Sequence, residues 1–414
     1  MKKTIALLLA SLAVTGSLTA PALAAEPETD TAGEDTTISQ QPQPDPDPEG
    51  TVSWANLESR IREGSLNSLI LSENISGIQG IDYEMMFEDL RDQINEIANF
   101  QWAMAMVGGD SSSLDQAYDA LRDTLDELKD GELQADNADV VWQLEDMTNQ
   151  VVSGGQSLYL TILELEAQAE DGQRGLETLD RNLEQLRLRE QLGQVSRQTV
   201  AELEQTRAET VSQLSTLDVT IATLKEQLQT MLGEEPTGEL ALGDLPALEE
   251  TGWEEPDYDA DLEAAKAASW TLRSAQKTLE DAEETWEDAQ DDYRAKQEEY
   301  LLQQAEHTWN AAQLTYQSEV ESFETGFKSL YDSLADYEQI LESKQSALSW
   351  QQTLLETAEK KYELGLISHS ALLDVRDDVA SAQSAVDSAQ RDLFSARNSY
   401  TWAVERGLLS TQTV

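Results

Sequence analysis

Apolar residues recur at alternating steps of three and four through the second half of the chain, where no proline or glycine occurs between Pro256 and Gly326. This spacing is the heptad seam of long paired helices. One side of the seam is alanine and the other is large, so that two helix backbones approach closely while large side chains fill the remaining space. The seam positions are Ala265, Ala268, Leu272, Ala275, Leu279, Ala282, Trp286, Ala289 and Tyr293.

The chain also repeats itself at a shift of 172 residues. Residues 154–196 align with 326–368 without a gap, and Leu-Gly at 192–193 falls on Leu-Gly at 364–365. The apolar seams that follow the two turns also fall on the same positions when shifted by 172 residues. This indicates a structural unit built twice. Arg207 and Thr210 make the first copy less regular. The matching seams are Leu372, Val375, Val379, Ala382, Val386, Ala389, Leu393, Ala396, Tyr400 and Ala403, and Val200, Leu203, Arg207, Thr210, Leu214, Leu217, Ile221, Leu224, Leu228 and Met231.

Each copy predicts a long helix, a short Leu-Gly-x-x-Ser turn and another long helix. The fold class is therefore all-α, with long antiparallel helical hairpins in two tandem repeats and little or no β-structure. A rod of this length, with about 55 Å in one helix alone, cannot bury both faces of its helices, which predicts packing against other copies or other proteins. The expected domains are a first helical repeat at 53–233, a connector at 234–256, a second helical repeat at 257–409 and a tail at 410–414.

Within the first repeat, apolar positions predict two further helical pieces before the duplicated part. The first begins near Ser53 and is interrupted by Gly77 and Gly80. The second runs from Met86 through Trp102 and Met106 to a break at Gly108-Gly109.

The first 52 residues predict export rather than a folded domain. Residues 1–24 combine Lys2 and Lys3, an apolar run and the small residues Ala22-Leu23-Ala24, which is typical of a secretory signal peptide. Residues 25–52 are rich in proline and acids and predict a disordered tether. After the signal no apolar run is long enough for a transmembrane helix.

Composition narrows the functional classes. The chain carries 27 basic and 81 acidic residues, a net charge of −54, so we expect no binding to nucleic acid or anionic lipid. The acid excess indicates a solvated helical surface, with a cation-dependent role as the alternative, although no Asp-x-Asp-x-Asx-Gly calcium loop occurs. With no cysteine, neither a disulfide nor a lipidated N-terminal cysteine is available. We expect no metal and no cofactor.

At the turn of the second copy the sequence resembles the TolC-like family of outer-membrane efflux proteins. The resemblance rests on Lys-Tyr-Glu-Leu-Gly-Leu-Ile-Ser at 361–368, Leu-Leu-Asp at 372–374 and an alanine-rich helix that ends in Gly407-Leu408. The first copy supports it with Leu-Gly-Gln-Val-Ser at 192–196 and Met-Leu-Gly at 231–233, followed by Leu240-Ala241-Leu242. It covers about residues 150–414, and 53–150 only by general arrangement.

This resemblance implies a TolC-like α-barrel protomer, a homotrimeric duct for efflux that works with a membrane-fusion adaptor and a cytoplasmic-membrane transporter. Its glycine-containing turns would dock the adaptor, which assigns Leu364, Gly365 and Leu366 in the second copy and Leu192 and Gly193 in the first. Gln194 stands where the family often has an apolar residue. A plain helix cap explains both glycines equally well.

The family also narrows its closed tip with a ring of carboxylates. Asp374 matches one such position, whereas Ala371 stands where the second acid is expected. An ordinary acid on a solvated helix face is the alternative for Asp374.

The sequence departs from the family in its membrane strands. Such strands alternate apolar and polar residues over about 9 to 11 positions. Residues 307–341 show helical spacing instead, and the one alternating stretch of the first half, 157–163, has a helical counterpart at 329–334. We therefore expect no β-barrel. The location expected from the signal and the resemblance is the cell envelope, at the outer membrane. If the strands are absent, the expected location is extracytoplasmic, either soluble or at the surface.

Catalysis has little support in the sequence. The two histidines are His307 and His369, and no phosphate loop or nucleophile elbow occurs. His369 lies beside Ser368, which we expect to be a helix N-cap. The chain is thus predicted not to be an enzyme. The competing function is a secreted or envelope-associated coiled-coil spacer that transports nothing.

Overall fold

The computed structural model describes residues 46–108, 112–248, 253, 255–296 and 299–409. The signal peptide, most of the expected tether and the tail lie outside this part. The chain divides into two compact units, one with residues 75–142 and one with residues 46–74 and 143–409.

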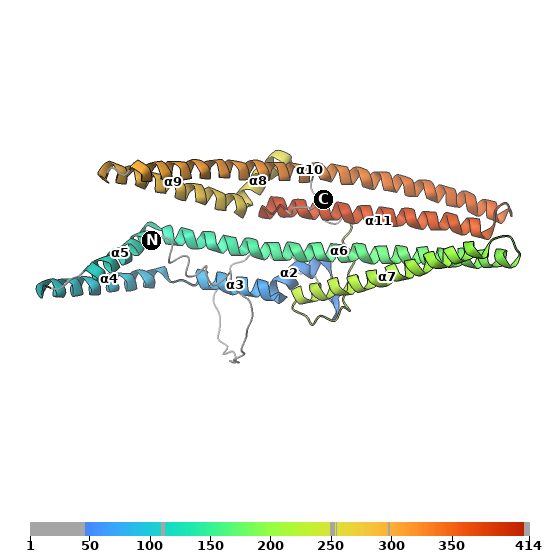
Figure 1. The fold of residues 1–414 in the computed structure, drawn as a ribbon, viewed down its shortest axis with the longest axis horizontal. Coiled ribbons are helices and arrows are strands. Elements are labelled where there is room, and N and C mark those ends of the chain that lie inside the picture. The colour runs from blue at the N-terminus through green and yellow to red at the C-terminus, as the bar shows by residue number, and fades with distance from the viewer. Residues whose placement is uncertain (1–45, 109–111, 249–252, 254, 297–298, 410–414) are drawn as a thin grey trace. The chain divides into compact units, whose positions relative to one another are not determined.

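The described elements are helices apart from two short strands (Figure 1). They are β1 Thr51–Val52, α2 Trp54–Gly64, α3 Leu66–Gln79, α4 Tyr83–Met106, α5 Ser112–Asp130, α6 Glu132–Gln191, α7 Arg197–Met231, β2 Ala241–Leu242, α8 Tyr258–Ala268, α9 Trp270–Lys296, α10 Glu299–Glu363 and α11 His369–Arg406. The all-α prediction is confirmed. Among the described helices, none combines the length and apolar character needed to cross a membrane.

In the second unit, the four helices of the duplicated hairpins form a row in the order α7, α6, α11, α10 (Figure 1). Ion pairs join α6 to α7, with Lys225 Nζ 2.6 Å from Glu166 Oε1. Between α10 and α11, Arg376 lies 2.9 Å from Glu359. The two middle helices, α6 and α11, are joined by a series of polar contacts between their side chains.

The predicted seams are the buried faces of these helices. On α11 the seam residues Val386, Ala389 and Leu393 pack with Leu341 of α10. The first copy is less thoroughly buried, and Arg207 of its seam pairs with Asp180 on α6. The irregular seam position at Arg207 thus forms a polar contact across the hairpin rather than a core.

One predicted helix is interrupted where the sequence showed no break. Ser269 is extended, with φ −79° and ψ 113°, and separates α8 from α9 within the seam. Ser65 separates α2 from α3 in the same way, with φ −69° and ψ 124°. The predicted interruption is confirmed at Gly80, since α3 ends at Gln79, whereas Gly77 lies inside α3. The break at Ser65 is an additional one that the sequence does not predict. Neither serine is a helix breaker by composition, so packing decides both breaks.

Order begins before the expected start at Ser53. Thr51 and Val52 pair in parallel with Ala241 and Leu242, and Val52 is fully buried. Asp47 ties the preceding residues to α2, because its carboxylate accepts hydrogen bonds from Ser53 N at 3.0 Å, Asn56 Nδ2 at 2.9 Å and Arg60 Nη1 at 3.1 Å. The described end of the expected tether therefore belongs to the folded unit.

The main core of the second unit lies where β1 and β2 meet the helices. Tyr159 of α6 is fully buried there, and its hydroxyl donates to Gly243 O at 2.6 Å. Its neighbours in this cluster include Val52, Ile61, Leu228 and Trp402. This core joins residues 52–61 to the far ends of α7 and α11.

The first unit centres on the hairpin of α4 and α5. Leu90 of α4 packs with Leu125 and Leu128 of α5. The end of α4 agrees with the predicted break, since Val107 is its C-cap and Gly108 has a left-handed φ of 70°.

Candidate functional site

The turn of the second repeat, residues 364–368, is fixed by backbone hydrogen bonds. Gly365 has φ +68°, its amide donates to Tyr362 O at 2.8 Å, and the amide of Leu366 donates to Lys361 O at 2.8 Å. These two bonds define a Schellman motif, which needs a left-handed residue at the position of the glycine. Ser368 then caps α11 by accepting a hydrogen bond from Ala371 N at 3.2 Å, as expected.

This turn holds large apolar side chains in solvent. Leu364 is 74% exposed and Leu366 is 69% exposed. The turn does not depend on burying them, because its geometry comes from the backbone. A Cβ at Gly365 would meet no atom within 4 Å, so the surroundings of the turn are open. The leucines are thus displayed on a preformed turn.

The turn of the first repeat, residues 192–196, has the same geometry. Gly193 has φ +70° and donates to Glu190 O at 2.8 Å, while Gln194 N donates to Arg189 O at 2.9 Å. Ser196 caps α7. Leu192 is 65% exposed. Gln194 occupies the place of Leu366, so the first turn displays one leucine fewer.

A ladder of contacts between α6 and α11 brings both turns to one end of the second unit. As the residue number rises on α6 it falls on α11, which shows that the helices are antiparallel. The contact nearest the turns joins Gln185 to Ser370 at 3.0 Å. The other contacts join Gln156 to Asn398 and Trp402, Glu164 to Ser388 and Arg391, Asp171 to Ser384, and Thr178 and Arg181 to Asp377.

Asp374 and Asp377 differ in their surroundings. Asp374 is exposed on the second turn of α11. Asp377, one turn later, accepts hydrogen bonds from Thr178 Oγ1 at 2.9 Å and from Arg181. The acid in contact with the other repeat is therefore Asp377. The sequence could not single it out, because its partners lie almost 200 residues away.

The two histidines lie apart from any shared site. His369 is the first residue of α11, and its ring centroid is 5.7 Å from that of Tyr362. His307 is exposed within α10. Both histidines therefore lie on exposed helix surfaces.

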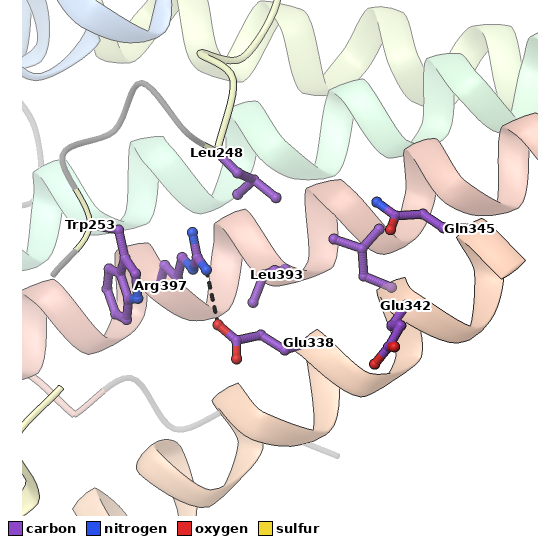
Figure 2. A pocket seen from close by; sticks show the side chains of 8 residues that line it. Leu248, Trp253, Glu338, Glu342, Gln345, Leu393 and Arg397 are labelled. Carbon is purple, nitrogen blue, oxygen red and sulfur yellow. Dashed lines mark hydrogen bonds and ion pairs between the residues drawn. The ribbon is translucent and has the colours of Figure 1, made fainter. Parts of the chain in front are cut away.

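A shallow cavity of about 410 Å³ lies between the connector and helices α10 and α11 (Figure 2). Arg397 of α11 stacks 4.9 Å from the ring of Trp253 and pairs with Glu338 of α10 at 2.9 Å. Leu248 and Leu393 complete its apolar side. The guanidinium of Arg397 is thus already stacked on Trp253 and paired with Glu338 within the chain. These contacts hold the connector against the second repeat.

Searches against protein-family models and curated proteins give no match. Solved structures do match. The outer-membrane channel OprN has a TM-score of 0.52 at 13% identity, with 85% of this chain and 89% of that chain covered. The open state of the MtrE outer membrane channel of Neisseria gonorrhoeae has a TM-score of 0.52 at 14% identity, with 85% and 88% covered.

The CmeC outer membrane channel of Campylobacter jejuni has a TM-score of 0.51 at 12% identity, with 70% of this chain and 69% of that chain covered. The chain therefore has the fold of TolC-family outer-membrane channels. The resemblance inferred from the two turns is confirmed at the level of fold. All three of these solved structures are outer-membrane channels.

Proposed function

We propose that this chain is the duct component of an export system, in which copies of the chain form a helical conduit. An adaptor protein docks on the two turns, residues 192–196 (the first tip) and 364–368 (the second tip). One observation carries the proposal: two equivalent turns, locked by glycine, display Leu192, Leu364 and Leu366 in solvent at the same end of one unit. Large apolar side chains on a rigid turn suit a partner that buries them.

The partner in this proposal is a membrane-fusion adaptor whose own helical hairpin contacts the leucines at 192, 364 and 366. Gly193 and Gly365 act by fixing the turns, not by touching the partner. A cytoplasmic-membrane transporter would supply the cargo and the energy. The tip of the second repeat, with two leucines, is the stronger docking surface of the two.

The conduit itself is proposed to be a homotrimer in the cell envelope, at the outer membrane. The fold shared with outer-membrane channels supports this assembly. Asp374 is proposed to add a negative charge near the opening at the tips. It is exposed and lies nine residues after Gly365, on the second turn of α11. Asp377 is held on Arg181 and is less free to do so.

Photo-crosslinking in cells of the source organism tests the docking. A photoreactive residue at Leu364 is expected to capture a protein that is anchored in the cytoplasmic membrane and carries a long helical hairpin. Tyr300 is the control, because it is 68% exposed but lies at the opposite end of α10. Equal capture of the same protein from Tyr300, or capture of only unrelated proteins from Leu364, would refute docking at the tips.

The spacer function predicts a different assembly. Light scattering on residues 25–414 is expected to show an elongated trimer if the chain is a duct. A solid dimer, or a monomer that the captured adaptor fails to assemble, would instead support the spacer.

A further inference from the structure

A second apolar seam runs along α10 on the face turned away from α11. Trp350 lies nine residues after Leu341, which is two and a half helical turns, and so projects from the opposite side of the helix. Leu341 is buried against α11, whereas Trp350 is 63% exposed. The exposed seam keeps steps of three and four and contains no charged residue. Its members are Ile340, Ser343, Ala347, Trp350 and Leu354.

Helix α7 carries a complementary seam on the face turned away from α6. Val219 lies nine residues before Leu228, which is fully buried, and Val219 itself is 65% exposed. The exposed residues on this side are mostly small, in contrast to those of α10, although Glu204 and Gln205 interrupt them between Ala201 and Ala208. The small residues are Ala201, Ala208, Val211, Ser215 and Val219.

The row of helices makes these two seams its two outer edges. Helices α6 and α11 lie inside the row, and α7 and α10 lie outside (Figure 1). Since the edges are unlike, the α10 edge of one copy fits the α7 edge of another, which is a heterologous contact. Such contacts close into a ring when the copies are related by rotation alone.

Charge favours the same pairing. A chain with a net charge of −54 repels its own copies over most of its surface. The two seams place a large apolar face against a small one, and Glu204, the acid on this side of α7, lies 11 residues before Ser215 and is paired with Arg187 at 2.6 Å. Contact there buries apolar surface and avoids bringing acids together.

The structure also sets the height above the tips, measured along the helices, at which the two seams meet. Gln185 is six residues before the end of α6, Ser370 is one residue after the start of α11, and the two are hydrogen-bonded at 3.0 Å. The first tip therefore extends about five residues, roughly 7 Å, beyond the second. Trp350 lies 13 residues before the end of α10, hence about 18 residues above the first tip.

Copies in a ring are related by rotation about an axis along the helices, with no shift along that axis. Residues at the same height above the tips therefore lie beside one another in neighbouring copies. The residue 18 positions after Arg197, the first residue of α7, is Ser215. Resting on the proposed assembly of copies, we infer that Trp350 of one copy packs on Ser215 of the next, between Val211 and Val219. The indole of Trp350 would then contact the small side chain of Ser215, with the larger valine side chains on either side of it.

Cysteine crosslinking tests this register, because the chain has no cysteine of its own. The double variant Trp350→Cys, Ser215→Cys is expected to form a ladder of disulfide-linked copies on a non-reducing gel. A mixture of the two single variants should give a linked pair, and neither single variant alone should. The matched control is Trp350→Cys with Ala201→Cys, which lies 14 residues, about 21 Å, further along the exposed side of α7.

Equal crosslinking at Ala201, or linkage of Trp350→Cys to itself, would overturn the inference. An oligomer that forms without crosslinking at Ser215 would also overturn it and leave the proposed conduit standing. A chain that stays monomeric with its adaptor would instead remove the assembly and the inference together.

A charge in the seam gives an independent measurement. Trp350→Glu is expected to lower the mass seen by light scattering to that of the monomer, with helix content by circular dichroism unchanged because the side chain is exposed. Ser349→Glu places the same charge on another exposed side of α10 and should leave the oligomer intact. An equal loss of mass in both variants would count against the seam.

Discussion

Gly407 closes α11 directly against Ser269, the residue at which the chain passes from α8 to α9. A Cβ at Gly407 would lie 2.3 Å from Ser269 Cα, so the two backbones are in contact. The first repeat has the same arrangement, because a Cβ at Gly233, after α7, would lie 2.4 Å from Gly64 O, beside the break at Ser65. In both repeats a left-handed glycine ends one helix against the break in another.

Substitution of Gly407 by alanine is expected to destabilise the second unit strongly. Alanine at φ +64° costs about 1–2 kcal/mol, and its methyl group meets the backbone of Ser269, which cannot move aside as a side chain can. Thermal unfolding followed by circular dichroism measures the loss. Gly365→Ala is the matched control, since its φ is +68° but the space around it is open. Similar losses in the two variants would show that the contact with Ser269 adds nothing.

Polar residues at the second tip are expected to reduce docking without affecting the fold. With the photoreactive residue at Leu192 instead, Leu364→Gln together with Leu366→Gln should lower adaptor crosslinking at least several-fold. Both leucines are exposed and contribute little to the fold. The free energy of unfolding should change by less than about 0.5 kcal/mol. Gln194→Leu, which makes the first tip resemble the second, is expected to raise crosslinking. Unchanged crosslinking in both directions would contradict docking at these turns.

The Asp47 carboxylate is expected to make stability depend on pH in the acid range. Burial acts to raise the pKa of Asp47, but hydrogen bonds from Ser53, Asn56 and Arg60 outweigh it and hold the pKa below the usual 3.8. Since the folded pKa is the lower one, the carboxylate stabilises the fold above pH about 3.8, and this contribution is lost as the pH falls through the folded pKa.

Asp47→Asn should therefore cost about 2–3 kcal/mol at pH 7 and progressively less below pH about 3.8. Denaturant unfolding at a series of pH values measures the difference. The nearby Glu49 is exposed, so Glu49→Gln serves as the control and should change stability little at any pH. A pH-independent cost for Asp47→Asn would show that the carboxylate acts through packing alone.

The alanines of the second seam are expected to tolerate no enlargement. Ala389 is 3% exposed between α11 and α10, and Ala389→Leu should cost about 1–3 kcal/mol through overpacking. The equivalent position of the first repeat, 172 residues earlier, is already Leu217 and is only partly buried. Chemical denaturation compares Ala389→Leu with Ala311→Leu, the same change at an exposed alanine of α10. Equal stability of the two variants would show that close helix approach is not needed at Ala389.

The sequence by itself determined the long helices, their seams and the two turns. Heptad spacing, glycine and serine at the turns and the shift of 172 are local or periodic signals, and local signals are what backbone geometry and apolar patterning encode. The same signals place the leucines at 364 and 366 in a turn, whereas their role in docking an adaptor is implied by the family resemblance and stays a prediction.

Only the tertiary structure decided the breaks at Ser65 and Ser269, the strand contact of Val52 and the pairing of Asp377 with Arg181. Each depends on a partner far away in the chain: Gly407 for Ser269, Ala241 and Leu242 for the strand, and the other repeat for Asp377. A polar residue on a helix carries no periodic signal that names its partner. Long-range contacts between backbones and between charges therefore had to come from the fold.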